Sequence, residues 1–233
     1  MSDRTDTPRL TALLPMKGHS ARVPGKNLRP LLGRPLFHWT AAALQASDLV
    51  ERIVVNTDSE AIAESVAAHF SKAVVHWRPE AIRGDEVSMN RIIADDLSRL
   101  EGEHFLQTHS TNPLLATATI QAAVRAYFAG LPGHDSLFTV TPQRKRFYWP
   151  DGRPVNHDPA VLLPTQDLPP LLEENSNLYL FSRASFRAAG QRRIGLTPQL
   201  FPMDPLEALD IDEESDFHMA GLLLAGRAGR AGA

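Results

Sequence analysis

The chain has 233 residues, of which 43% are hydrophobic and 22% charged, a composition typical of a soluble globular protein. Its net charge of −3 gives no general attraction for nucleic acid or for an anionic membrane, so phosphate binding would require a local cluster of cations. Because the chain has no cysteine, a disulfide framework, a thiolate zinc site and a cysteine nucleophile are excluded. The polar first residues carry no signal core, and no apolar run is long enough to span a bilayer, so we expect a cytoplasmic protein.

Apolar, β-branched runs alternate with helical patterns along most of the chain. The runs predict strands over residues 10–14, 52–56, 73–77, 104–108, 136–141, 177–181 and 208–210. The helical spacing predicts helices over residues 36–46, 60–70, 88–100, 116–129, 183–189 and 213–224. This alternation indicates an α/β fold, with a mostly parallel sheet and helices on both of its faces.

The alternation stops at residues 142–170, a segment with seven prolines and no clear helix. A long irregular segment inside a compact domain is usually a functional flap or an oligomer contact, and the alternative is a plain surface excursion. The Ala, Gly and Arg repeat over residues 225–233 indicates low complexity. We therefore expect one domain over residues 1–226, with an excursion at about 142–170, and a flexible tail over 227–233.

A loop with glycines and cations follows the first predicted strand and precedes the first predicted helix. It carries Lys17, Arg22 and Lys26 within ten residues. Glycine lets the backbone come close to a ligand, and the start of a helix favours anions. The loop is not a Walker A motif, because Asn27 follows Lys26, and no G-x-G-x-x-G occurs in the chain. It suits a polyphosphate, although such loops are also common surface turns.

Two aspartates near the other end of the chain form the second candidate. If residues 208–210 end a strand, alternation places Asp210 and Asp212 on the same face. Such a pair can hold Mg²⁺, which takes oxygen ligands and shares them with phosphates. Alternatively, Asp212 only caps the helix that follows. A triphosphate needs both cationic groups and a metal, and this chain offers one set of each.

Two further polar candidates, Arg78 and Gln107 with the polar loop that follows it, lie at the ends of predicted strands, where open α/β sheets bind their ligands. Asn175 and Tyr179 belong to a second polar patch, which enters a predicted strand. The excursion adds a basic cluster, Arg144 to Arg146, which suits an acidic substrate but is more often a solvated charge run. The nine histidines show no metal-binding spacing, and none is assigned to catalysis.

Six motifs in this order resemble the acylneuraminate-type cytidylyltransferases, the CMP-sialic acid synthetases and their relatives. They are Pro24-Gly25-Lys26-Asn27, Val54-Val55-Asn56-Thr57-Asp58-Ser59, Arg78-Pro79-Glu80, Gln107 to Leu114, Asn175 to Tyr179, and Asp210-Ile211-Asp212. The resemblance implies a Rossmann-like fold and an enzyme that transfers CMP from CTP to the hydroxyl of an acidic 2-keto sugar, a sialic-acid-like nonulosonate. It also implies release of pyrophosphate, Mg²⁺ dependence, and a homodimer in which each excursion reaches over the partner's site.

The resemblance also implies roles for single residues. The catalytic residues would be Lys17, Lys26 and Asp210, and the metal ligands Asp210 and Asp212. The nucleotide would contact Lys17, Ser20, Lys26, Asn27, Arg78 and Ser88, and the acceptor would contact Gln107, Asn175 and Tyr179, with Arg144 and Lys145.

Two departures from the family pattern leave the activity open in part. Lys17 stands where many members have Arg, and the loop after Gln107 is two residues longer than usual and lacks a terminal Arg. The alternatives are the same transfer to an octulosonate or a phosphonate, and a nucleotide-binding module without turnover.

Overall fold

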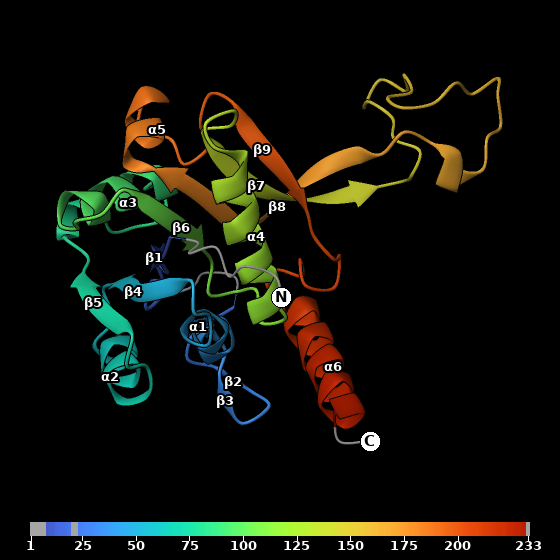
Figure 1. The fold of residues 1–233 in the computed structure, drawn as a ribbon. Helices are drawn as coiled ribbons and strands as arrows, with labels where there is room; N and C mark the ends of the chain where they lie inside the picture. Colours follow the sequence, from blue (N-terminus) through green and yellow to red (C-terminus); the bar gives the residue numbers. More distant parts are fainter. Residues whose placement is uncertain (1–7, 20–22, 232–233) are drawn as a thin grey trace, which may run out of the picture.

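The computed structural model describes residues 8–19 and 23–231, and the side chains as far as residue 227. A seven-stranded sheet forms its centre, in the order β5-β4-β1-β6-β8-β7-β9 (Figure 1). The strands are β1 (Leu10–Leu13), β4 (Val50–Thr57), β5 (Ala73–Trp77), β6 (His104–Thr108), β7 (Ser136–Gln143), β8 (Leu171–Ser182) and β9 (Pro198–Pro202). Strand β8 runs antiparallel to both of its neighbours, and every other pairing in this sheet is parallel. The expected mostly parallel α/β fold is confirmed.

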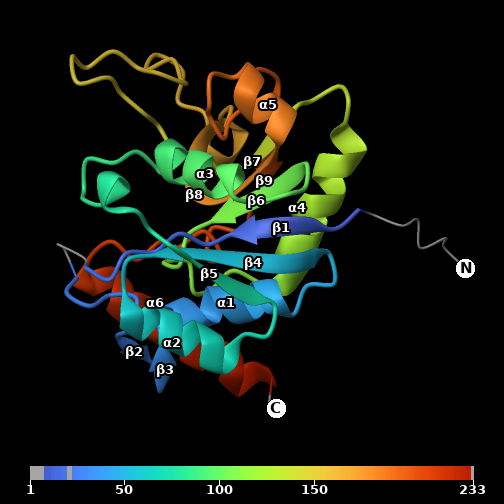
Figure 2. The same cartoon turned by 90° about the vertical axis from the view of Figure 1, so that its left-hand side faces the viewer.

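Successive side chains of a strand point to opposite faces of the sheet, and in the inner strands both sets are buried. Helices therefore cover both faces of the sheet. Helices α1 (Phe37–Gln45), α2 (Glu60–His69) and α4 (Thr117–Gly130) pack on one face, and α3 (Met89–Ser98) and α5 (Arg183–Ala188) on the other (Figure 2). In β4, Ile53 and Val55 join the first core and Val54 joins the second. This layering leaves the loops at the carboxyl ends of the parallel strands free to form a site.

The last helix, α6 (Glu214–Ala231), packs beside the small hairpin of β2 (Pro30–Leu31) and β3 (Arg34–Pro35). A third apolar cluster, which includes Leu31, Ile211 and Phe217, joins them. Two short 3₁₀ turns lie at Glu80–Ile82 and Thr165–Asp167. Helix α6 continues to Ala231, so the described part of the tail that we expected to be flexible is helical.

The strand predicted over residues 208–210 is wrong, because this segment forms the end of a turn followed by irregular backbone. Ile211 is fixed there by a hydrogen bond from its N–H to the carbonyl of Thr111. The last strand is β9, which begins and ends with proline. Proline lacks an N–H donor and is tolerated at the edge of a sheet, where β9 pairs with β7 alone. The prediction that strand alternation places Asp210 and Asp212 on one face therefore has no basis. The irregular backbone around Ile211 determines where the two aspartates lie.

The expected excursion lies between β7 and β8. These two strands extend together past the rest of the sheet, and residues 144–170 project beyond them (Figure 1). Tyr148, Trp149 and Leu162 on this segment are exposed. In the part of the chain that the structure describes, no helix is both long and apolar enough to cross a membrane.

Candidate active site

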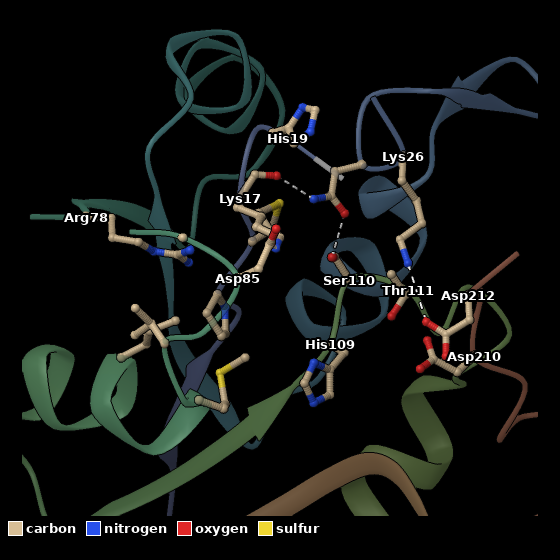
Figure 3. A pocket seen from close by; sticks show the side chains of 17 residues that line it. Lys17, His19, Lys26, Arg78, Asp85, His109, Ser110, Thr111, Asp210 and Asp212 are labelled. Carbon is tan, nitrogen blue, oxygen red and sulfur yellow. Dashed lines mark hydrogen bonds and ion pairs between the residues drawn. The ribbon is translucent and has the colours of Figure 1, made fainter. Parts of the chain in front are cut away.

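A cavity of about 540 Å³ opens where the loops after β1, β5 and β6 meet the segment before α6. This is the carboxyl edge of the parallel strands, where open α/β sheets bind ligands. Its walls carry cations, carboxylates and amides (Figure 3). The lining residues are Pro15, Met16, Lys17, His19, Lys26, Asn27, Arg78, Gly84, Asp85, Val87, Met89, Ile92, His109, Ser110, Thr111, Asp210 and Asp212.

Lys26 and the two aspartates share one wall of this cavity, although Lys26 and Asp210 lie 184 positions apart in the sequence (210 − 26). The Lys26 Nζ donates to the carbonyl of Ile211 and lies 3.9 Å from Asp212 Oδ1 (Figure 3). Its side chain is only 12% exposed, so little solvent screens this charge. The wall thus presents a cation and two carboxylates to one space.

The buried side chain of Asn27 ties the first loop to the loop after β6. Its Nδ2 donates to the carbonyl of Lys17 at 2.9 Å, and its Oδ1 accepts from the hydroxyl of Ser110 at 2.8 Å. The amide is therefore engaged by protein at both ends. In this structure Asn27 sets the shape of the loop that carries Lys17.

Lys17 forms an ion pair with Asp85, which comes from the loop before α3. The hydrogen bond and the charge of Lys17 lower the pKa of the Asp85 carboxyl. Both side chains are exposed, so we expect the pair to be weak. A phosphate that binds Lys17 would displace Asp85 or share the ammonium group with it.

The surroundings of Asp210 leave one carboxylate oxygen that a metal ion could contact. Burial raises the pKa of its carboxyl and a hydrogen bond from Thr111 opposes that shift, while the charge of Asp212 adds to the rise. Its Oδ1 is buried without any hydrogen-bond partner. An orphaned carboxylate oxygen is costly unless a cation meets it. Among the described residues, no group of three or more His, Cys, Asp and Glu side chains gathers as a metal site, so phosphate oxygens would complete the ligand set.

Arg78 lines the opposite side of the cavity but is 4% exposed and bonded within the protein. Its Nε donates to Asn56 Oδ1 at 2.8 Å and its Nη2 to the Asn56 carbonyl at 2.9 Å. Ser88 precedes α3, is exposed, and does not line the cavity, so the structure does not place it with the other nucleotide candidates. Ser20 lies outside the described residues.

The residues predicted to bind the acceptor are divided between two places. Gln107 and Tyr179 are buried neighbours across the β6–β8 pairing. Asn175 lines a second cavity, of about 360 Å³, and the two cavities share Asp210. Arg144 and Lys145 line neither cavity, so within one chain the prediction that they contact the acceptor is not supported. Arg144 is engaged within the excursion instead, where it donates to the carbonyls of Gln166 and Leu168.

Two residues of this region, His109 and Arg193, were not expected from the sequence. His109 lines the first cavity, and Arg193 Nη1 lies 3.3 Å from its Nε2 and donates to Gln107 Oε1. Histidine spacing could not reveal His109, because its partner is an arginine in an irregular segment. The one sequence feature that pointed to this region was the polar loop after Gln107. It did not single out His109 within the loop.

The stability of the fold is expected to fall as the pH drops below about 6.5, because burial and the charges of Arg193 and Lys26 lower the pKa of His109 to about 3. Between these values the unfolded chain binds the extra proton, so unfolding free energy rises with pH, by up to about 1.4 kcal/mol per pH unit. Burial and His69 lower the pKa of His38 to about 4, which adds to the trend.

Urea midpoints of the wild type and of His109→Gln, compared at about pH 7.5 and about pH 5, measure this effect. The variant should show the weaker pH dependence, since glutamine does not titrate. Equal pH dependence in both proteins would contradict the assignment to His109.

The comparisons with known proteins fit a nucleotide-binding α/β enzyme. The family model described as cytidylyltransferase matches residues 11–221. The chain is 27% identical to a post-translational flagellin modification protein B of Campylobacter coli, over 89% of this chain and 92% of that protein. It is 29% identical to N-acylneuraminate cytidylyltransferase A of Danio rerio over 91% of this chain, which spans about half of that longer protein (50%).

A solved structure of a CMP:2-keto-3-deoxy-manno-octonic acid synthetase in complex with CTP shares the fold. Its TM-score is 0.70 at 13% identity, covering 94% of this chain and 99% of that one. The chain therefore belongs to the cytidylyltransferase family, and it is a CTP-dependent nucleotidyltransferase.

Proposed function

We propose that this enzyme transfers CMP from CTP to the hydroxyl of an acidic 2-keto sugar of the nonulosonate type and releases pyrophosphate. The observation that carries the proposal is the meeting of Lys26 with Asp210 and Asp212 at one wall of the cavity. Relatives whose names include acylneuraminate, legionaminic acid and octulosonate support an acidic acceptor.

The triphosphate would lie along the wall that carries Lys26, with Lys17 at its other end. Both cations would neutralise charge on the departing pyrophosphate, which is the main task of a protein in phosphoryl transfer. Asp85 would give up or share Lys17 when the phosphates arrive. Asp210 and Asp212 would hold Mg²⁺, which supplies charge neutralisation at the phosphate oxygens.

The acceptor would lie at the boundary of the two cavities. Asp210 forms part of both, so a hydroxyl placed beside its carboxylate faces the nucleotide on one side and the second cavity on the other. The second cavity carries polar groups, with Glu174, Asn175 and Ser176 in its walls. Such walls suit a sugar that both donates and accepts hydrogen bonds.

We also propose that two copies pair through the excursion. Tyr148, Trp149 and Leu162 expose large apolar surfaces on a segment that projects from its own sheet. Pairing would cover these surfaces, and it would bring Arg144 and Lys145 of one copy toward the acceptor cavity of the other. Light scattering of the purified protein would report a dimer mass, and a monomer at micromolar concentration would contradict the pairing.

A panel of acceptors tests the activity. The wild type is incubated with CTP, Mg²⁺ and each of a sialic acid, a legionaminic acid, an octulosonate and a phosphonate, and pyrophosphate release is measured. We expect release with at least one nonulosonate, and none when CTP is replaced by ATP or when EDTA is added. Release with the octulosonate or the phosphonate alone would identify the other acceptor class. CTP binding without release under any acceptor would favour a module without turnover.

A further inference from the structure

Arg78 is held against the end of β4, and one edge of its guanidinium remains available at the first cavity. Its Nε donates to Asn56 Oδ1 at 2.8 Å and its Nη2 to the Asn56 carbonyl at 2.9 Å, so one residue engages two of the three guanidinium nitrogens. Nη1 makes no hydrogen bond to a described residue, and the guanidinium points into the cavity (Figure 3). The N–H groups of Nη1 can therefore donate to a ligand there.

The side-chain amide of Asn56 must keep one orientation to hold Arg78 in this way. Its oxygen accepts and its nitrogen donates, so a rotated amide would turn a donor toward the Arg78 Nε–H, which can only donate. In the structure the Asn56 Nδ2 donates to Asp96 Oδ1 at 2.8 Å. Because an ionised carboxylate only accepts hydrogen bonds, Asp96 takes the nitrogen end of the amide and leaves the oxygen end to Arg78.

Asp96 is a buried carboxylate of α3 that lines neither cavity. Its Oδ1 also accepts from His76 Nδ1 at 2.8 Å and lies 3.6 Å from Arg99 Nη2. Its Oδ2 is buried and has no hydrogen-bond partner among the described residues. Burying a carboxylate costs folding free energy, and well-packed apolar residues are often at least as stabilising as a buried ion pair. Stability alone therefore does not explain this carboxylate, whereas the orientation of Asn56 does.

Asp96 also acts on Arg78 through its charge. Burial lowers the pKa of the Arg78 guanidinium, and the negative charges of Asp58 and Asp96 oppose that shift. Asp58 accepts from the Gly18 N–H at 2.8 Å, so it holds the first loop. Of these two carboxylates, Asp96 is the one that is hydrogen-bonded to the residue that holds Arg78.

We propose that Asp96 is a positioning residue for nucleotide binding, which fixes the Asn56 amide so that the Nη1 edge of Arg78 faces bound CTP. The inference goes beyond the proposed function, because it concerns CTP and does not depend on which acid accepts CMP. Binding of CTP in the absence of any acceptor therefore tests it separately from the acceptor panel.

Asp96→Asn is the most informative variant, because asparagine has the shape of aspartate but carries a donor as well as an acceptor. Either end of the Asn56 amide could then pair with it, so the orientation of Asn56 would no longer be fixed. We expect the Kd for CTP, measured with Mg²⁺ by isothermal titration calorimetry, to rise by about tenfold, the effect of one hydrogen bond. A thermal melt shows whether the variant is folded.

A double-mutant cycle separates an effect through Arg78 from a general effect on the fold. Arg78→Met should itself weaken CTP binding, and in that background Asp96→Asn should change the Kd by less than about twofold, because no guanidinium is left to position. The same loss in both backgrounds would overturn the inference, and so would an unchanged Kd in Arg78→Met. If Asp96→Asn does not fold, Asn56→Ala decides, since it removes the same contact to Arg78 Nε and should also raise the Kd.

Asp95→Asn is the matched control. Asp95 precedes Asp96 on the same helix, but its carboxylate pairs with Arg99 and not with Asn56. This variant should keep the wild-type Kd for CTP. An equal rise in Asp95→Asn would mean that negative charge on α3 matters and the hydrogen bond to Asn56 does not. That result, or wild-type affinity in folded Asp96→Asn, would contradict the role of Asp96.

Discussion

Asp210→Asn is expected to lower kcat by about 100-fold or more while leaving the unfolding temperature unchanged or higher. The carboxylate would hold the metal at the point of transfer, and asparagine keeps its shape without its charge. Burial and the charge of Asp212 raise the pKa of the Asp210 carboxyl, although Thr111 opposes the shift, so the charged form costs folding free energy at neutral pH. Removing that charge should therefore stabilise the folded state and slow the reaction. Such opposite effects on stability and activity are expected of functional residues.

Steady-state pyrophosphate release and a thermal melt measure the two effects. Asp212→Asn should lower kcat similarly, with a smaller change in stability because Asp212 is more exposed. Asp204→Asn is the matched control, since Asp204 lies on the same segment but lines neither cavity. Wild-type turnover in both Asp210→Asn and Asp212→Asn would exclude these aspartates as metal ligands.

Lys26→Met is expected to lower kcat/KM for CTP by about 100-fold or more. The side chain is largely buried against the carbonyl of Ile211, and its charge faces the space where the triphosphate would lie. Methionine keeps the length and removes the charge. The KM for the acceptor should change much less, because the acceptor occupies the other side of Asp210.

Lys72→Met provides the comparison for this prediction. Lys72 also donates to backbone carbonyls, those of Ser47 and Val50, but it lies outside both cavities. We expect it to lower the unfolding temperature and to leave the kinetics with CTP unchanged. Equal kinetic losses in the two variants would mean that Lys26 acts through stability alone.

The sheet could be predicted because its inner strands are buried and therefore consist mostly of apolar residues, a pattern that is visible in the sequence. The short run of β1 and the β-branched run in the second half of β4 are buried on both faces, and the helices of this region show helical spacing. The edge could not be predicted in this way. Strand β9 contains two prolines and is only partly buried, and residues 208–210 have the apolar character of a strand but have no partner in the sheet.

The nucleotide side of the site was easier to predict than the acceptor side. Lys26 follows β1, a strand that the sequence predicts correctly, so its edge of the sheet could be predicted. Asp210 was expected at the end of a strand that does not form, and its place beside Lys26 comes from a loop held by the hydrogen bond from the Ile211 N–H to the Thr111 carbonyl. Arg193 belongs to an irregular segment after α5, and its position depends on contacts with Gln107 and Tyr179 that no local pattern encodes. The excursion was recognised by its prolines, but a single chain carries its basic residues away from both cavities.

The most direct measurement is a crystal structure of the enzyme with CTP and Mn²⁺, in which the anomalous signal of manganese locates the ion. We expect the triphosphate to lie against Lys26 and the ion to contact carboxylate oxygens of Asp210 and Asp212. A nucleotide bound outside this cavity, or an ion that touches neither aspartate, would contradict the site described here.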